Sequence, residues 1–141
     1  MRKPTRWVVT ALALSAGPAL AACSSAPVDD EVQPAVVAEV PGSELPLITL
    51  TDSGAERTGI ETTAISSQSS SSVPYSAVLY APSGDTWVYV SPEPLTYTRH
   101  PVTVEAIDGD QAILADGLTP GTEVVTVGVA ELYGAELGIG Q

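Results

Sequence analysis

The sequence predicts an all-β domain, a small antiparallel β-roll or barrel with one short helical turn, preceded by a disordered tether. Three observations predict this class. Val, Ile and Thr are abundant, and β-branched residues favour strands over helices. Twelve Gly and twelve Pro divide the chain into short segments separated by turns. A length of 141 residues leaves room for one domain and hardly for two, and we expect that domain at residues 46–141.

The first 22 residues have the three-part layout of a secretory signal peptide: a basic start, an apolar run and a Gly-Pro break. The sequence Leu-Ala-Ala-Cys at 20–23 resembles the lipobox of bacterial lipoproteins and contains the only Cys of the chain. That resemblance implies cleavage between Ala22 and Cys23 and a diacylglyceryl thioether on Cys23, which anchors the chain in a membrane. The alternative is ordinary signal-peptidase cleavage one residue earlier. A membrane-spanning anchor is disfavoured because the apolar stretch is shorter than the ~20 residues that a bilayer requires.

A tether is predicted for residues 23–45. The segment contains three Pro and five acidic residues but no basic residue. Charged, Pro-containing sequence of this kind does not bury enough apolar surface to pack. Residues 36–38 have only weak strand character, so the whole segment is interpreted as a spacer between a membrane surface and the domain.

Short runs of β-type sequence alternate with turn signals in the domain. A helical turn over residues 52–57 is expected, with Asp52 or Ser53 as its cap and Gly59 at its end. The Ser-rich stretch 66–72 predicts a flexible loop. The expected strands are 47–51, 60–65, 75–80, 87–90, 95–107, 111–115 and 123–127.

The longest expected strand, 95–107, changes the phase of its alternation at His100-Pro101. Because Pro cannot donate to a ladder, a bulge or an edge position is predicted there. Asp108-Gly109 is a tight hairpin signal that leads into the next strand. In the tail, Gly134 and Gly138 are expected to interrupt any long helix.

Charge excludes several functions. Beyond Cys23 the chain carries seventeen acidic residues against Arg57 and Arg99, with no Lys. Such a surface repels phosphate, so neither nucleic-acid binding nor recruitment to anionic membranes by a polybasic patch is expected.

The residues for catalysis or metal binding are also few. One Cys excludes an internal disulfide, and His100 is the only imidazole, with no nucleophile marked nearby. A hydrolase acting through His100 is the remaining catalytic alternative. Asp108-Gly109-Asp110 does not continue as a calcium loop because Ala112 stands where the next oxygen ligand belongs. We therefore expect no enzyme, no metal and no cofactor.

One group of residues is a candidate interaction surface. Trp87 and Tyr89 alternate on one strand, and Tyr97 and Arg99 share a parity on the next. Exposed, these side chains would offer a stacking platform. Since the chain has no Phe, however, Trp87 and Tyr89 are interpreted first as the main core aromatics.

Several segments together resemble the membrane-proximal part of periplasmic adaptor proteins, or membrane fusion proteins, of efflux and secretion pumps. The segments, in the order of the family, are Ile48-Thr49-Leu50-Thr51 leading to Gly59-Ile60-Glu61-Thr62, then Val73-Pro74-Tyr75-Ser76-Ala77-Val78, Gly84-Asp85-Thr86-Trp87-Val88-Tyr89-Val90, Arg99-His100-Pro101-Val102, and Gly117-Leu118-Thr119-Pro120-Gly121-Thr122-Glu123-Val124-Val125 followed by Gly128. Each Gly or Pro stands at a turn that the strand pattern already requires.

The resemblance covers Leu47 to Gly128 but not the full architecture of the family. Complete adaptors carry a lipoyl-like domain, a helical hairpin and a further barrel where this chain has only residues 66–72, and this chain has no heptad repeat. The resemblance requires residues 47–65 to pair with strands from beyond Val73.

Two functions follow as expectations. The resemblance implies a non-catalytic, lipid-anchored domain on the outer face of a bacterial cell membrane, in contact with a transporter permease. The alternative is an envelope lipoprotein that binds a small ligand or cell-wall polymer through Trp87, Tyr89 and Tyr97, with an acidic field that favours cations.

Overall fold

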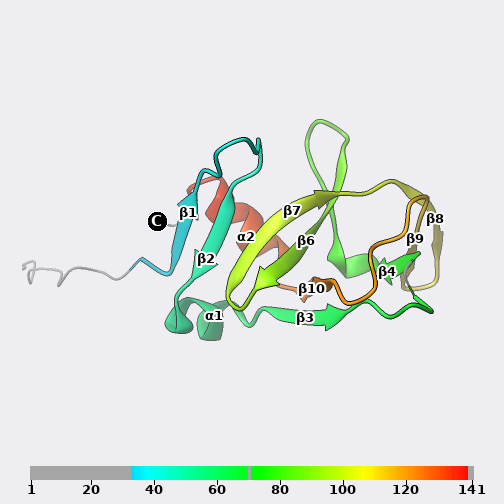
Figure 1. Cartoon of the computed structure of the whole chain (residues 1–141), viewed down its shortest axis with the longest axis horizontal. Helices are drawn as coiled ribbons and strands as arrows, with labels where there is room; N and C mark the ends of the chain where they lie inside the picture. The colour runs from blue at the N-terminus through cyan, green and yellow to red at the C-terminus, as the bar shows by residue number, and fades with distance from the viewer. Residues whose placement is uncertain (1–32, 70, 140–141) are drawn as a thin grey trace, which may run out of the picture. The chain divides into compact units, whose positions relative to one another are not determined.

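The computed structural model describes residues 33–69 and 71–139, which belong to one compact unit (Figure 1). The predicted signal peptide, Ala22, Cys23 and the first part of the predicted tether lie outside the described residues. No helix within the described residues is long and apolar enough to cross a membrane.

The described chain forms two antiparallel sheets and two α-helices. The elements are β1 (Ala35–Ala38), β2 (Leu47–Leu50), α1 (Asp52–Thr58), β3 (Glu61–Ala64), β4 (Ser72–Pro74), the 3₁₀ turn η1 (Tyr75–Ala77), β5 (Val78–Tyr80), β6 (Thr86–Glu93), β7 (Thr96–Pro101), β8 (Val104–Asp108), β9 (Gln111–Leu114), β10 (Glu123–Val127) and α2 (Val129–Glu136).

The larger sheet has the strand order β1-β2-β7-β6-β10-β3, and β5 also pairs with β6; the smaller sheet has the order β4-β9-β8. Every pairing in both sheets is antiparallel. The predicted all-β class is therefore confirmed. The sheets do not close into a barrel, because β1 and β3 each end the larger sheet without a second neighbour within the described chain.

Strands on the N-terminal side of the Ser-rich stretch 66–72, called the serine bridge below, pair with strands on its C-terminal side. Strand β2 pairs with β7, and β3 pairs with β10. Beyond the end of β3, the Ile65 N–H donates to the Thr122 carbonyl (2.8 Å), and the Gly121 N–H donates to the Ile65 carbonyl (2.7 Å). The pairing that the sequence resemblance requires is present.

The central strands of the larger sheet bury side chains on both faces. Consecutive residues of β6, Val88 and Tyr89, are both fully buried, as are Val124 and Val125 of β10. Because neighbouring side chains on a strand point to opposite faces, the sheet separates two cores. The aliphatic core, which includes strands of the smaller sheet, consists of Ile65, Val73, Ala77, Val78, Val88, Ala112, Leu114, Leu118 and Val124. The helix-side core consists of Ala35, Ile48, Leu50, Tyr89, Tyr97, Val125, Val129 and Leu132.

Part of the predicted tether belongs to the domain. Strand β1 pairs with β2 over four residues, Ala35 is only 3% exposed, and the Thr51 N–H donates to the Pro34 carbonyl (3.1 Å). A Cβ at Gly54 of α1 would collide with that same carbonyl, so glycine permits the close approach. The prediction of an unpacked segment up to residue 45 is wrong for β1, because main-chain pairing and one buried Ala leave little trace in composition.

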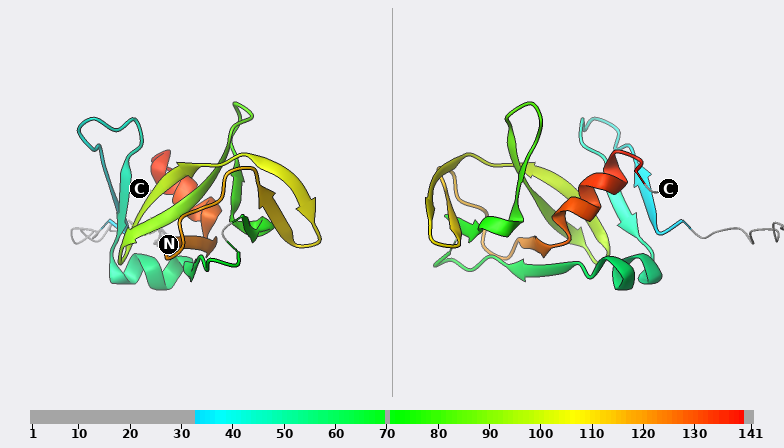
Figure 2. Two further views of the ribbon diagram at one scale, coloured as in Figure 1. Left: turned by 45° about the vertical axis from the view of Figure 1, so that its right-hand side comes forward. Right: turned by 180° about the vertical axis from the view of Figure 1, so that it is seen from behind.

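The tail contains a second helix, which the sequence did not predict. Helix α2 passes through Gly134, although Gly in a helix interior costs about 1 kcal/mol relative to Ala. An isolated helix of this length would be marginal in water, so tertiary contacts hold it. Val129 and Leu132 supply those contacts by burying their side chains against the larger sheet, where α2 lies across the strands (Figure 2, right).

The other local expectations hold only in part. The strand expected at 75–80 begins as the 3₁₀ turn η1, so only Val78–Tyr80 forms a strand. Helix α1 forms as predicted and ends at Gly59, but its cap is Thr51, whose hydroxyl accepts from the Gly54 N–H (3.1 Å). The hairpin predicted at Asp108-Gly109 joins β8 to β9. The long expected strand 95–107 divides into β7 and β8, which belong to different sheets. Strand β6 continues to Glu93 through a register shift, at the position where a loop was expected.

Candidate interaction site

The four residues of the predicted interaction surface lie on one face of the larger sheet. Tyr89 of β6 stands directly opposite Arg99 of β7 in the ladder. Trp87 and Tyr97 each lie two residues away along their own strands, and residues two apart share a face. The sequence therefore identified a real cluster, whose members come from both strands of one hairpin.

Helix α2 covers much of this face, and that changes what the cluster can do. Tyr89 is fully buried and Tyr97 nearly so, within the helix-side core that α2 completes. The expectation that these two residues form an exposed platform is wrong. Tyr89 is a core aromatic, as the core interpretation of Trp87 and Tyr89 predicted, and Tyr97 is buried as well. Trp87 remains half-buried.

Glu136, in the last turn of α2, joins the helix to both strands of the hairpin. Its Oε1 lies 2.7 Å from Arg99 Nη2, and its Oε2 accepts a hydrogen bond from the Tyr89 hydroxyl at 2.6 Å. The side chains are largely withdrawn from water, since Arg99 is 18% exposed and Glu136 is 8% exposed. Removing either partner from such a pair leaves the other charge poorly solvated.

Tyr89 acts here as a hydrogen-bond donor. Burial raises the pKa of Tyr89 far above its ordinary value, and the hydrogen bond to Glu136 and the negative charge of that carboxylate raise it further. The positive charge of Arg99 opposes this effect without reversing it. The hydroxyl stays protonated at neutral pH, which favours a structural bond over acid–base chemistry.

Arg99 also contacts Trp87, with its guanidinium carbon 4.7 Å from the ring centroid. This distance is typical of a cation–π interaction. Trp87 Nε1 and Arg99 Nε are buried and have no hydrogen-bond partner in the described part of the chain. Arg99 thus links the half-buried indole to the buried carboxylate.

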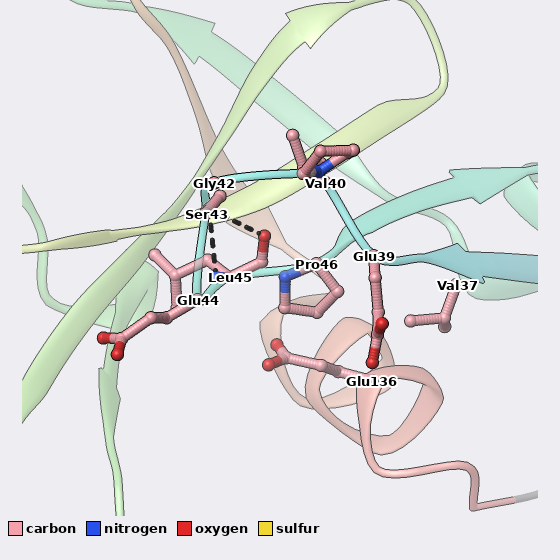
Figure 3. A pocket seen from close by; sticks show the side chains of 10 residues that line it. Val37, Glu39, Val40, Gly42, Ser43, Glu44, Leu45, Pro46 and Glu136 are labelled. Carbon is pink, nitrogen blue, oxygen red and sulfur yellow. Dashed lines mark hydrogen bonds between the residues drawn. The ribbon is translucent and has the colours of Figure 1, made fainter.

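A hollow of about 690 Å³ opens beside this cluster, between the β1–β2 connection and the end of α2 (Figure 3). Glu39 and Glu44 line it together with Glu136, and Figure 3 shows the Glu39 side chain pointing toward α2. The hollow is acidic as well as open. The described residues nevertheless contain no group of three or more His, Cys, Asp or Glu side chains placed to hold a metal ion.

The remaining candidate residues are not brought together. His100 is exposed near the end of β7, and Asp108 and Asp110 flank the β8–β9 turn. Glu136 was not predicted as a member of the site. The available signal was helical spacing in the tail, where Val129, Leu132 and Glu136 fall on one face.

Comparison of the chain with family models, with curated proteins and with solved structures found no match.

Proposed function

We propose that this protein is a non-catalytic, lipid-anchored domain of the periplasmic-adaptor type, which contacts a transporter permease at the outer face of a bacterial cell membrane. One observation carries the proposal. Strands β2 and β3 pair with β7 and β10 across a serine bridge, as they must if the two ends of an adaptor's membrane-proximal domain are retained without the intervening domains.

The positions of the family-like motifs support this proposal. Gly59 ends α1 ahead of β3, Gly84 lies in the turn before β6, and Gly121 lies in the turn before β10. Val73-Pro74 lies in β4, at the edge of the smaller sheet. The motifs thus mark starts and ends of paired strands, so the sequence resemblance and the fold are consistent.

The lipid anchor would hold the domain near the membrane. Eleven residue steps separate Cys23 from Pro34, which directly precedes β1. A chain of that length reaches at most about 40 Å when fully extended. Because β1 belongs to the domain, the spacer is much shorter than the sequence predicted, and contacts are restricted to partners close to the bilayer.

The test is recovery of the intact lipoprotein from cross-linked membranes of the cells that make it. We expect a transporter permease to be recovered with it. The Cys23→Ala variant should lose both acyl labelling and the permease, because it lacks the anchor. Recovery of the lipidated protein without any transporter subunit would refute the proposal.

The alternative of a ligand-binding envelope lipoprotein has less support. Its stacking surface required Trp87, Tyr89 and Tyr97 to be accessible, and two of these three side chains are buried in the helix-side core.

A further inference from the structure

Two exposed side chains, Tyr80 and Val127, line one groove, and a third, Tyr75, lies next to Tyr80. Tyr75 and Tyr80 are 48% and 50% exposed, and Val127 is 47% exposed. The two tyrosine rings lie 6.1 Å apart between centroids in a tilted arrangement. The groove has a volume of about 520 Å³, and its lining comes from η1, β5, the end of β10 and the start of α2, including Val78, Tyr80, Val127 and Glu131.

The groove exists because the larger sheet divides at β6. Along one edge of β6, residues 86–88 pair with β5 and residues 90–91 pair with the start of β10. Beyond Val124, strand β10 pairs only with β3. Strand β5 and the second half of β10 therefore border the groove from opposite sides. In Figure 2 (right), the green segment that contains β5 diverges from the orange β10 and the red α2.

The free edge of β5 offers main-chain hydrogen-bonding groups. Thr86 directs its carbonyl away from β5, because that carbonyl accepts from the Val102 N–H (3.0 Å). Tyr80 stands opposite Thr86 in the ladder, so its own N–H and carbonyl point away from β6. Residues two apart face the same way, so the Val78 carbonyl does too. These groups form no hydrogen bond with another described residue.

We propose that this groove binds an extended, positively charged polypeptide segment of another protein, which adds to β5 as a further strand. Main-chain pairing would supply affinity, and Tyr75 and Tyr80 would act as aromatic anchors, a common role for exposed tyrosine at interfaces. The inference rests on the proposed function for its partner, which we take to be an extracytoplasmic segment of the permease.

Charge favours a basic polypeptide segment in this groove over a second copy of the chain or an anionic bilayer. Glu131 lines the groove, and no Lys or Arg among the described residues does so. The chain beyond Cys23 is strongly acidic, so a second copy or an anionic bilayer would bring like charges together, whereas Lys and Arg on a partner segment would be attracted.

The test places a photoreactive benzoylphenylalanine at Val127 in the full-length chain, expressed in its own cells, with Ile107 as the matched control position. Ile107 is 49% exposed and lies on β8, in the smaller sheet. We expect an adduct from position 127 that maps to a segment rich in Lys or Arg on the permease, and none from position 107. The Tyr75→Ser and Tyr80→Ser changes together should reduce this adduct by about tenfold or more, since aromatic anchors dominate such interfaces. The control change Leu137→Ser, at an apolar position that is 57% exposed and lies outside the groove, should leave the adduct unchanged.

The outcomes separate the two proposals. A dimer of the chain, a lipid adduct, equal adducts from both positions or no adduct would each overturn the groove proposal. If the permease is recovered from membranes but position 127 gives none of the expected adduct, only the groove proposal fails. If position 127 cross-links to a basic segment of a protein outside any transporter, the groove proposal stands and the proposed function fails.

Discussion

The aliphatic core and the helix-side core lie on opposite faces of the same strands, β6 and β10, and they are stabilised differently. The aliphatic core is formed by Val, Ile, Leu and Ala alone. The helix-side core includes two tyrosines and adjoins the Arg99–Glu136 pair. The first gains stability from buried apolar area, in proportion to the side chains enclosed. The second also depends on one carboxylate that joins a short helix to a hairpin, so its parts should be strongly coupled.

The largest effect should come from breaking that carboxylate's ion pair. The Arg99→Met substitution leaves Glu136 with little solvent and no counter-ion, and we expect a loss of about 4 kcal/mol in the free energy of unfolding. Urea unfolding followed by circular dichroism measures this loss. Adding Glu136→Leu to the same chain should restore part of the stability, because the unpaired charge is then gone. A loss below about 1 kcal/mol, typical of surface pairs, would show that the pair is solvated.

A cavity in the aliphatic core should cost somewhat less. Leu114→Ala removes a nearly fully buried side chain, and we expect a loss of about 3 kcal/mol from lost burial and the cavity left behind. The control is Leu137→Ala, at a position that is 57% exposed, where the change should stay within about 0.5 kcal/mol. Equal losses at the two positions would contradict the assignment of this core.

Removing a single hydroxyl should have a smaller effect. Tyr89→Phe keeps the ring packing and deletes the hydrogen bond to Glu136, and we expect a loss of about 2 kcal/mol, as for bonds to charged groups. Tyr97→Phe is the matched control, since its hydroxyl makes no hydrogen bond with another described residue. In a Glu136→Gln background the effect of Tyr89→Phe should shrink, and additive losses would argue against coupling.

The smallest effect concerns pH. Because the pKa of Tyr89 is raised in the folded state, the unfolded chain releases this proton first, near pH 10. Stability from this group is complete below that pH and falls above it, by about 1.4 kcal/mol per pH unit. Unfolding at pH 8 and pH 11 should therefore show a smaller alkaline loss for Tyr89→Phe than for the parent, while Leu114→Ala keeps the parent's dependence. If Tyr89→Phe lost as much stability at pH 11 as the parent, the loss could not be assigned to ionisation of Tyr89.

The elements that could be predicted from the sequence are those set by local residues, and the elements that could not be predicted depend on tertiary contacts. Most strands of the domain could be located, because alternation and turn residues are local signals. The tight hairpin at Asp108 and the end of α1 at Gly59 were correct for the same reason. Strand β1 was missed because its stability comes from β2, and α2 was missed because Gly134 lowers helix propensity while buried Leu132 restores the helix.

The candidate site was predicted only in part, for a physical reason. Side chains alternate between the two faces of a strand, and this alternation predicted a shared face for Trp87, Tyr89, Tyr97 and Arg99. Whether that face is exposed depends on what packs against it. Glu136 lies 47 residues from Tyr89 along the chain, and only the tertiary arrangement joins them. The register of the β6–β7 hairpin was also hidden, because β6 continues past the residue at which a loop was expected.

The serine bridge makes the domain well suited to engineering. Its two ends are held by separate hydrogen bonds. At one end the Ile65 N–H donates to the Thr122 carbonyl, just before β10 (2.8 Å), and at the other the Leu114 N–H of the smaller sheet donates to the Ser71 carbonyl (2.8 Å). Neither attachment depends on the length of the connection between them, and loop extension adds little entropic cost per residue. A fluorescent reporter with neighbouring termini, spliced in after Ser67, should leave both sheets intact and report on the lipoprotein in living cells.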